Sequence, residues 1–349
     1  MTVVAVTGAA GPLGSSLLAR LDADPAVDRI LGVDVVEPDM PVAKLDMRIA
    51  DVRDPVLPHA LDGADVVVHL AAWVHAQVPE EVRFARTVQG TRNVLTAAEK
   101  VGASMLVHLS TAMVYGAHPD NPVPLTEEAR LRANPDAPAA YHALLAEELV
   151  AAFGDAQPSV SVAVLRPATI FGPGVESPVT RLLEAPRVPA VAGYEPTLQA
   201  VDLEDVSAAL HRVADGRLSG TYNVAPEGWL TWAEATSIAG CRPLRVPEAL
   251  AMGIVIALDR LLGREVSPGE LAYLMHPWVV DPSRLRAAGW QATKSNRDVL
   301  RAAAEAHRPW LRMAGVRVRR RNLYAGAAAC AAAATGTVAW RAFRRRNRR

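Results

Sequence analysis

Short apolar runs alternate with amphipathic stretches through the first half of the chain. Five runs rich in Val, Ile and Leu have the length of strands, at residues 3–6, 30–36, 64–70, 105–109 and 161–165. Apolar residues at helical spacing occupy segments between them, at 14–22, 80–101 and 139–153. Strands without polar alternation are typical of a parallel sheet covered by helices on both faces. The pattern predicts an α/β fold, a Rossmann-type doubly wound parallel sheet with right-handed crossovers.

The pattern loosens after about residue 173, where proline and glycine become frequent. Short strand signals lie near 197–201 and 220–224. Helical patterns recur at 202–214, 231–239, 247–262 and 295–307. We therefore predict three parts: the sheet domain over 1–173, a smaller C-terminal substrate-binding region over 174–307 that is interleaved with the end of the sheet, and a tail over 308–349.

Charge is unevenly distributed along the 349 residues, although 37 basic and 37 acidic side chains cancel. Residues 307–349 hold twelve arginines and no acidic residue, which leaves a net of −12 on residues 1–306. An acidic body argues against nucleic acid as its partner. Two cysteines, Cys241 and Cys330, make no disulfide framework, and the first residues lack a secretory signal pattern. These features predict a cytoplasmic protein.

The tail is a separate problem. Basic segments at 316–322 and 341–349 enclose an uncharged, alanine-rich stretch of eighteen residues, 323–340, which only just reaches the length of a membrane span. Three interpretations stay open. Residues 316–349 form an anchor at the inner face of an anionic membrane, a flexible arm for nucleic acid or an acidic partner, or a helix docked on the acidic body.

A glycine-rich turn lies between the first strand and the first helix. Gly8, Gly11 and Gly14 are spaced three apart, and Pro12 and Leu13 fall at the start of the helix. Glycines allow a tight turn and let the backbone approach a pyrophosphate, which the helix N-terminus attracts. Proline is tolerated at this junction because it lacks only an N–H that needs no partner. The turn predicts a dinucleotide site.

Asp34 ends the second strand, twenty residues after Gly14. A carboxylate near this spacing binds the ribose hydroxyls of the adenosine half. It also repels a 2′-phosphate, and two valines rather than an arginine follow it. We therefore predict NAD rather than NADP as the cofactor. The alternative is a structural turn with a surface aspartate.

Together these residues resemble the extended branch of the short-chain dehydrogenase/reductase superfamily, the NAD-dependent epimerase/dehydratase family. The pattern TGxxGxxG is met by residues 7–14. Further family-like segments are 51–54 (DVRD), 69–72 (HLAA), 109–116, 165–173, 201–206, 222–224 and 281–290. The resemblance extends from residue 1 to about 307. It implies further cofactor contacts at Asp51, Val52, Leu70, Ala71, Ala72 and Pro167.

The resemblance also implies catalytic residues, Thr111 as the active-site hydroxyl and Tyr141 as the group that takes a proton while hydride leaves carbon. In the family a lysine four residues after the tyrosine lowers its pKa. Here that position is Leu145, and none of the three lysines stands four residues after any tyrosine. A second departure is Thr87, where the family has an asparagine.

Two interpretations of this site stay open. In the first, the protein is an NAD-dependent epimerase, dehydratase or dehydrogenase whose Tyr141 is assisted by another cation. In the second, it is an NAD-binding regulatory or scaffold protein with altered catalysis. His142 is no obvious substitute, because successive helical positions diverge by about 100°. We expect it to be an exposed helix histidine.

The resemblance implies a sugar-nucleotide-like or other alcohol substrate and a homodimer through the helices at 80–101 and 139–153. Candidate substrate contacts, each equally readable as ordinary core or surface, are Trp73, His75, Gln77, Arg181, Arg187 and Arg245. The apolar helix at 247–262 lines a hydrophobic pocket or is simply buried. The nine scattered histidines and two cysteines show no metal-binding spacing.

Overall fold

The computed structural model describes residues 2–71, 79–177, 179–180, 183–184, 187–253, 268–313 and 316–319. Several predictions lie outside these residues: those for Ala72, Trp73, His75, Gln77, Arg181, most of the helix at 247–262, and the tail from residue 320 onward.

Seven parallel strands form the main sheet in the order β11-β6-β5-β4-β1-β2-β3. The strands are β1 (Thr2–Thr7), β2 (Val27–Asp34), β3 (Leu45–Ile49), β4 (Val66–His69), β5 (Met105–Leu109), β6 (Ser161–Pro167) and β11 (Gly220–Val224). All neighbouring pairs in this sheet are parallel. The order reverses direction between β1 and β4, which defines a doubly wound sheet. The predicted fold class is confirmed.

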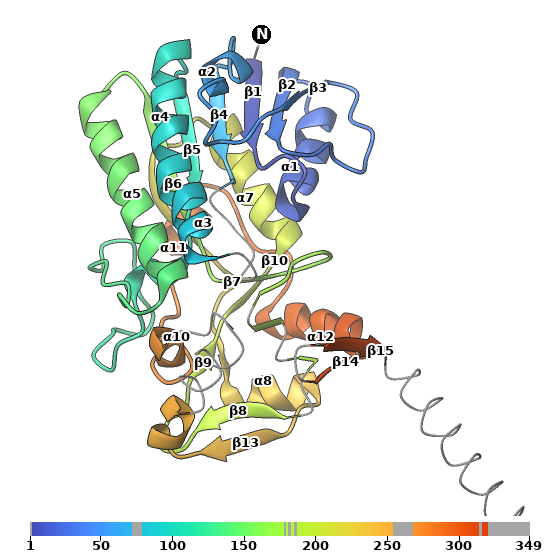
Figure 1. Ribbon diagram of the computed structural model, residues 1–349, viewed down its shortest axis with the longest axis vertical. Coiled ribbons are helices and arrows are strands. Elements are labelled where there is room, and N and C mark those ends of the chain that lie inside the picture. Colours follow the sequence, from blue (N-terminus) through green and yellow to red (C-terminus); the bar gives the residue numbers. More distant parts are fainter. Residues whose placement is uncertain are drawn as a thin grey trace, which may run out of the picture.

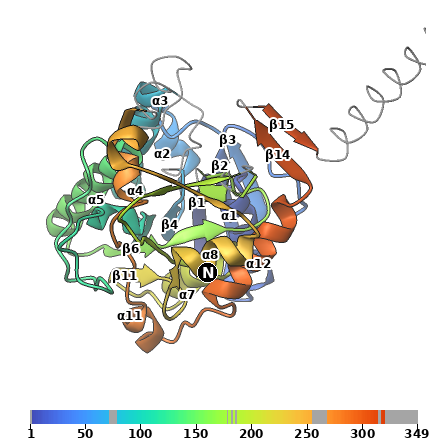
Figure 2. The same ribbon diagram turned by 90° about the horizontal axis from the view of Figure 1, so that it is seen from below.

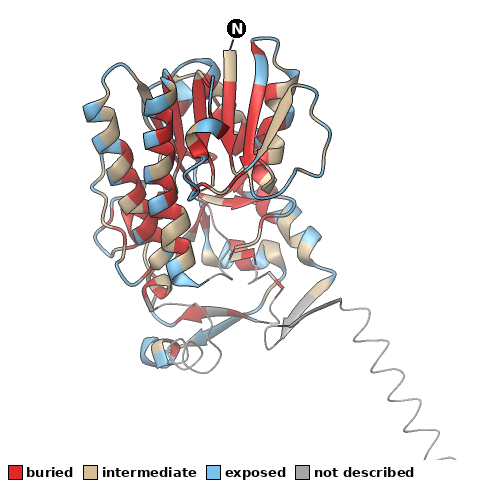
Figure 3. Cartoon of the chain, turned by 45° about the horizontal axis from the view of Figure 1, so that its top comes forward, coloured by how far each residue is buried: buried red, intermediate tan, exposed pale blue. Residues whose placement is uncertain are grey.

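Helices cover both faces of the sheet (Figure 1). One face holds α1 (Pro12–Ala23) and α7 (Leu203–Asp215), and the other holds α2 (Leu57–Ala60), α4 (Gly90–Val101) and α5 (Pro138–Ala156). Successive residues of β1 join different cores, since Val4 and Val6 pack with α1 while Ala5 packs with α4. Figure 3 shows the resulting burial of the sheet on both sides. This explains the unalternated apolar runs in the sequence.

The helical segment predicted at 80–101 consists of three elements, α3 (Glu80–Phe84), a π-helical turn η1 (Ala85–Gln89) and α4. The turn occurs where the chain approaches Val52 closely, since a Cβ on Gly90 would lie 2.7 Å from Val52 Cγ2. The α4 helix ends at Gly102, whose φ of 71° is left-handed and favours glycine. π-turns inside helices are frequent near functional sites.

The smaller region lies below the sheet in Figure 1 and is seen from below in Figure 2. Its two-stranded sheets pair β7 (Thr169–Phe171) with β10 (Ala200–Asp202), β8 (Val188–Val191) with β13 (Pro243–Val246), and β9 (Thr197–Leu198) with β12 (Leu230–Thr231). Its helices are α8 (Trp232–Ala239), α10 (Pro268–Ala272) and α12 (Asn296–His307), whereas α11 (Ser283–Ala287) packs against β11 of the main sheet. The chain returns to the main sheet at α7 and β11, so the two regions are interleaved.

The predicted tail begins with an antiparallel hairpin, β14 (Trp310–Met313) and β15 (Val316–Arg319). The Arg319 guanidinium lies 5.0 Å from the Trp310 ring centroid, within the range of a cation–π contact. Within the part of the chain that the structure describes, no helix combines the length and apolar character needed to cross a bilayer.

Candidate functional site

The glycine-rich turn follows β1 at the carboxyl edge of the sheet. Gly8 has a φ of +77°, and a Cβ there would lie 3.0 Å from the Ala71 nitrogen. A Cβ on Gly14 would overlap the carbonyl oxygen of Gly8 and lie 2.6 Å from that of Ala9. Packing alone therefore requires glycine at both positions. The close approach at Gly8 lets the turn lie against the end of β4.

Gly11 differs from its two neighbours. It is the N-cap of α1, with an extended backbone and no side-chain capping bond, and Pro12 and Leu13 follow in the first turn. A Cβ here would meet only the Gly8 oxygen at 3.4 Å, which is an ordinary van der Waals contact. Protein packing therefore does not require a glycine at this position. The open approach to the helix N-terminus suits a phosphate group.

Asp34 lies beside the turn. Its carboxylate accepts hydrogen bonds from the Ala10 N–H at 3.0 Å and the Val35 N–H at 2.7 Å. Val35 and Val36 are exposed, so apolar side chains follow the carboxylate at the surface. The predicted partners, the turn and the acidic residue, are thus brought together at the ends of β1 and β2.

The other predicted cofactor residues that the structure describes line the same edge. Asp51 is held by bonds from Arg53, Nε at 2.9 Å and Nη2 at 2.7 Å, which keep the pKa of its carboxyl below the usual range. Val52 is buried beneath Gly90, and Leu70 is buried at the end of β4. Ala71 touches Gly8 and Pro167 ends β6.

Two buried histidines lie beneath this edge. His69 begins the family-like segment 69–72, but the sequence predicted a role for neither histidine. His69 and His108 are neighbours in register on β4 and β5, with ring centroids 5.5 Å apart. Burial lowers the pKa of His69 well below its usual value and that of His108 to about 4, so both are neutral near pH 7. Their shared position at two strand ends was the available signal.

Hydrogen bonds fix the tautomer of His69. The Thr91 hydroxyl donates its proton to the Thr87 carbonyl at 2.5 Å, so it accepts from His69 Nε2 at 3.0 Å. Nδ1 then accepts from the Thr7 hydroxyl at 2.7 Å. This chain ties the glycine-rich turn to the π-turn, where Thr87 is buried.

Thr111 follows β5 and caps the 3-10 turn η2 (Ala112–Tyr115), accepting the Met113 N–H at 3.3 Å. The preceding Ser110 donates its hydroxyl proton to Glu147 of α5. Glu147 is ion-paired with Arg166, with Nη2 and Oε2 2.6 Å apart, and both side chains are buried. The paired charges compensate each other where both side chains are largely removed from solvent.

The network continues away from the cofactor edge. Arg166 Nη1 donates to the Tyr115 hydroxyl at 2.8 Å, which donates in turn to Asn223 Oδ1 at 2.9 Å. Asn223 also donates to the Leu125 carbonyl at 3.3 Å. The network therefore joins α5, η2, β6 and β11, and it includes Ser110, the residue directly before Thr111.

Tyr141 does not share the surroundings of Thr111. Its side chain is 37% exposed on α5, and its hydroxyl has no hydrogen-bond partner among the described residues. Leu145 is partly exposed one turn later. The predicted proton-transfer residue therefore lies on the outer side of the helix.

The expectation that His142 is exposed is wrong. It is buried, with its ring edge-on to Phe84 at 5.3 Å and Nε2 3.9 Å from the Glu80 carboxylate. Burial lowers its pKa. The cause is α3, which packs on α5 and covers this face, a tertiary contact that helical spacing alone does not reveal.

The candidate substrate arginines that the structure describes are dispersed. Arg187 is exposed, and Arg245 on β13 is exposed beside Glu195 at 3.6 Å. Within the described ranges no three His, Cys, Asp or Glu side chains are grouped as metal ligands.

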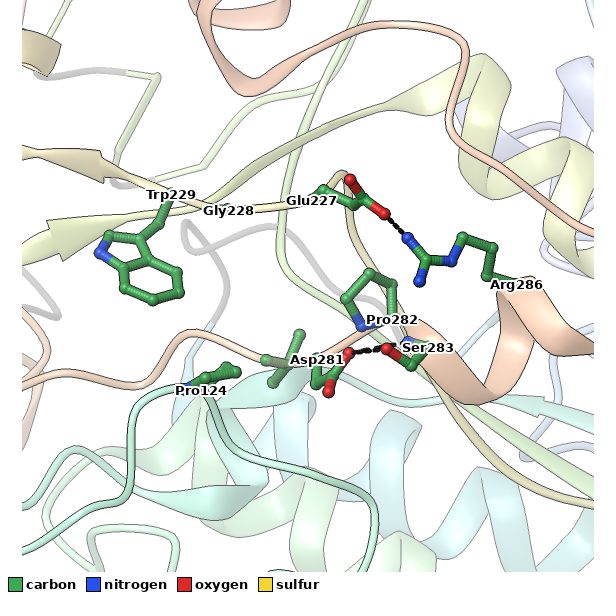
Figure 4. A pocket seen from close by; sticks show the side chains of 9 residues that line it. Pro124, Glu227, Gly228, Trp229, Asp281, Pro282, Ser283 and Arg286 are labelled. Carbon is green, nitrogen blue, oxygen red and sulfur yellow. Dashed lines mark hydrogen bonds and ion pairs between the residues drawn. The ribbon is translucent and has the colours of Figure 1, made fainter.

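A pocket of about 200 Å³ lies apart from the predicted residues, between the end of β11 and the start of α11 (Figure 4). Trp229, Pro124 and Pro282 form its apolar walls. Its charged groups pair with each other or with neighbours, Arg286 with Glu227 and Asp281 with the Ser283 hydroxyl. No residue of the glycine-rich turn or of α5 contributes to it.

Comparison with known proteins agrees with this geometry. Residues 4–225 match the model of the NAD dependent epimerase/dehydratase family. The uncharacterized protein Rv0501 of Mycobacterium tuberculosis is 33% identical over 299 residues, which cover 81% of this chain and 78% of that protein.

Solved structures share the fold. DesIV, a dTDP-glucose 4,6-dehydratase of Streptomyces venezuelae with NAD and TYD bound, matches with a TM-score of 0.68 at 22% identity, over 88% of this chain and 97% of its own. The UDP-glucose 4-epimerase of Thermus thermophilus, in complex with NAD, matches with a TM-score of 0.66 at 21% identity, over 88% and 99%.

The predictions of fold class, family and the cofactor NAD are confirmed. The predicted roles of individual residues, and the predicted boundaries between the three parts, stay predictions. The chain belongs to the NAD dependent epimerase/dehydratase family.

Proposed function

We propose that this protein binds NAD at the carboxyl edge of its sheet, as an NAD-dependent oxidoreductase of the epimerase/dehydratase type. The observation that carries the proposal is the glycine-rich turn fastened to Asp34 by the Ala10 N–H at 3.0 Å. The turn presents the first N–H groups of α1 to a pyrophosphate, and the carboxylate faces the position of the adenosine ribose. When bound, NAD supplies the hydride chemistry.

The glycines allow a sharp test. The Gly11→Ala variant should fold normally, because its Cβ would make only a 3.4 Å contact, yet it should weaken NAD binding by about tenfold or more because the methyl group occupies the phosphate approach. Gly154→Ala is the matched control. Gly154 lies on α5, away from the turn, and a Cβ there would make only an ordinary contact with Val162 at 3.5 Å. Calorimetric titration with NAD measures both. Unchanged affinity in Gly11→Ala would refute the proposed site.

Cofactor choice follows from Asp34. Native protein should bind NAD more tightly than NADP, since the carboxylate repels a 2′-phosphate and exposed valines rather than basic residues follow it. Equal affinity for the two cofactors would contradict this part of the proposal.

We further propose a sugar-nucleotide-like alcohol as the substrate, held beside the Thr111 hydroxyl. Support comes from the family, and from the fold that this chain shares with a dTDP-glucose 4,6-dehydratase and a UDP-glucose 4-epimerase. Thr111→Val keeps the shape of the side chain and removes its hydroxyl. It should lower turnover on any sugar nucleotide that the native protein converts, with NAD affinity unchanged, as steady-state kinetics would measure.

A second function has an observation in its favour. Tyr141 is exposed on α5, and Leu145 replaces the expected lysine, so the site lacks its predicted proton relay. An NAD-binding regulatory or scaffold protein would need the cofactor site without this relay. NAD binding without turnover across a panel of sugar nucleotides and simple alcohols would favour this second function.

The tail and the quaternary structure complete the proposal. We propose that residues 316–349 contact an anionic membrane surface, because their arginines are unbalanced by acidic residues, and that the chain forms a homodimer. Flotation of the full chain and of a chain ending at Gly315 with phosphatidylglycerol vesicles tests the first point. Sedimentation velocity tests the second.

A further inference from the structure

We infer that the α5 residues facing the Thr111 hydroxyl are Ala139 and Ala143, so that this helix brings neither a hydroxyl nor an amine to the reacting atoms. Tyr141 and Leu145 lie on a different side of the helix. The inference deepens the proposed NAD site and rests on it, since it concerns which side chains meet the bound cofactor.

The rotation of α5 about its axis is fixed by Glu147. Arg166 Nε donates to both carboxylate oxygens of Glu147, at 3.1 and 3.0 Å. Arg166 Nη2 also donates to Glu147 Oε2, at 2.6 Å. The Glu147 carboxylate also accepts the hydroxyl of Ser110, the residue directly before Thr111. A buried bidentate ion pair permits little rotation, because turning the helix would leave two charges unpaired out of water.

Helical spacing then assigns the other positions. Residues of an α-helix are about 100° apart, so Ala143 lies about 40° and Ala139 about 80° from the direction of Glu147. Tyr141, six residues before Glu147, lies about 120° away on the opposite flank, and Leu145 about 160° away. Glu147, Ala143 and Ala139 therefore form one stripe along α5, and this stripe contacts Ser110 through Glu147.

Burial supports this assignment independently. Ala140 and Ala146, on either flank of the stripe, have no exposed surface, and Ala143 is buried. Tyr141 and Glu148 are exposed, which marks the outward side of the helix. Ala139 is exposed, and it lies in the first turn of α5, on the same side of the helix as Ala143.

The stripe reaches the cofactor edge because of the chain direction. Strands β5 and β6 are parallel neighbours, and the crossover helix between them runs back antiparallel to both. Residues before Glu147 therefore lie progressively beyond the strand ends, on the side where Ser110 and Thr111 leave β5. Ala143 and Ala139 are the successive positions above this edge.

The chemical consequence concerns proton transfer. A base must come within about 2.6–3.2 Å of the proton that it removes, and a phenol with a pKa near 10 needs a nearby cation to act at neutral pH. Methyl groups at 139 and 143 provide neither. Thr111 can still hydrogen-bond a ligand oxygen, so the site holds a ligand without assisting hydride transfer from α5. This favours the second proposed function, an NAD-binding regulatory or scaffold protein, over an enzyme that turns over a substrate.

Cysteine labelling tests the assignment without relying on activity. In a Cys241→Ser/Cys330→Ser background, Ala139→Cys and Tyr141→Cys place thiols on two solvent-accessible positions of one helical turn. Maleimide labelling rates are measured with and without NAD at about 100 times its Kd, where about 1% of sites stay free. NAD should slow labelling of Ala139→Cys at least about tenfold and leave Tyr141→Cys unchanged, while calorimetry confirms binding in both variants.

The outcomes separate the two proposals. If NAD binds and protects Tyr141→Cys as strongly as Ala139→Cys, or protects neither, the inference is overturned while the NAD site stands. If calorimetry detects no NAD binding, the proposed function fails and the inference fails with it. Restoring chemistry gives a second readout. Ala139→Tyr/Ala143→Lys should gain NAD-linked turnover on the substrate panel, whereas a gain in Leu145→Lys alone would overturn the inference.

Discussion

The glycine-rich turn and helix α5 meet the same edge of the sheet but agree with their sequence patterns to different degrees. In the turn, Gly8 and Gly14 are required by backbone contacts, and Asp34 lies beside the turn, where it accepts a hydrogen bond from the Ala10 N–H. In α5, the tyrosine that the spacing singles out lies on the outer side, and alanines follow the stripe of Glu147. In the arrangement that we propose, the turn keeps the family pattern for binding the cofactor, while methyl groups of α5 stand where the family has its proton-transfer residues.

The difference teaches that a binding turn and a catalytic helix depend on structure at different ranges. The contacts that require Gly14 and that Gly11 would make lie within the turn itself, so this part of the geometry follows from the motif. The helix can be read only when its rotation is known, because a shift of two residues moves a side chain by about 200°. Four predictions test this contrast, beginning with the largest effect.

Removing the residue that fixes α5 should have the largest effect. Glu147→Ala leaves the buried Arg166 without its counter-charge, which we expect to cost about 3–5 kcal/mol of unfolding free energy in urea denaturation. Glu147→Met/Arg166→Met removes both charges and should regain most of that loss. If Glu147→Ala is as stable as the native protein, the ion pair does not fix the helix.

The buried histidines should make the sheet edge sensitive to acid. The folded pKa of His108, about 4, lies below the unfolded value of about 6.5. The folded state therefore favours neutral His108. The contribution of His108 to the free energy of unfolding is fully present above pH 6.5 and is lost as the pH falls toward 4. The loss is on the order of 3 kcal/mol.

Denaturation between pH 7 and pH 4 measures this loss, with His108→Gln as the control. Gln has a similar size and does not titrate in this range, so the variant should lose less stability on acidification than the native protein. Identical pH dependence in the two proteins would exclude His108 as the source.

Tightening the turn should have an intermediate effect. Gly14→Ala forces a methyl group against the carbonyls of Gly8 and Ala9, so α1 must move away from β1. We expect a loss of about 1–3 kcal/mol in thermal unfolding, together with weaker NAD binding. The contrast with Gly11→Ala separates packing from ligand approach. Similar stability losses in both variants would contradict the distinction.

The smallest effect is expected at Tyr141. Its exposed hydroxyl has no bonding partner among the described residues, so Tyr141→Phe should change stability by no more than about 0.5 kcal/mol and leave NAD affinity unchanged. Thermal unfolding and calorimetry measure the two quantities. A clear loss of NAD affinity would place Tyr141 next to the cofactor after all and remove the contrast between turn and helix.

Much of the fold could be predicted because burial leaves a direct mark on sequence. The apolar runs of β1, β4 and β5 lie in the middle of the sheet, where helices cover both faces, so polar residues are nearly absent from them. The pairing of the glycine-rich turn with Asp34 was also predictable, since the ends of adjacent parallel strands lie side by side. Burial of His142 was not, because α3 comes from a distant part of the chain.

The amino-acid sequence by itself determined the doubly wound sheet, the glycine-rich turn between β1 and α1, and the absence of lysine four residues after Tyr141. Each follows from composition or from residues close together in the chain. Only the tertiary structure decided which residues of α5 face Thr111 and which histidines are kept neutral. The physical reason is that both depend on partners far apart in sequence: Glu147 and Arg166 orient the helix, and neighbouring strands exclude water from His69 and His108.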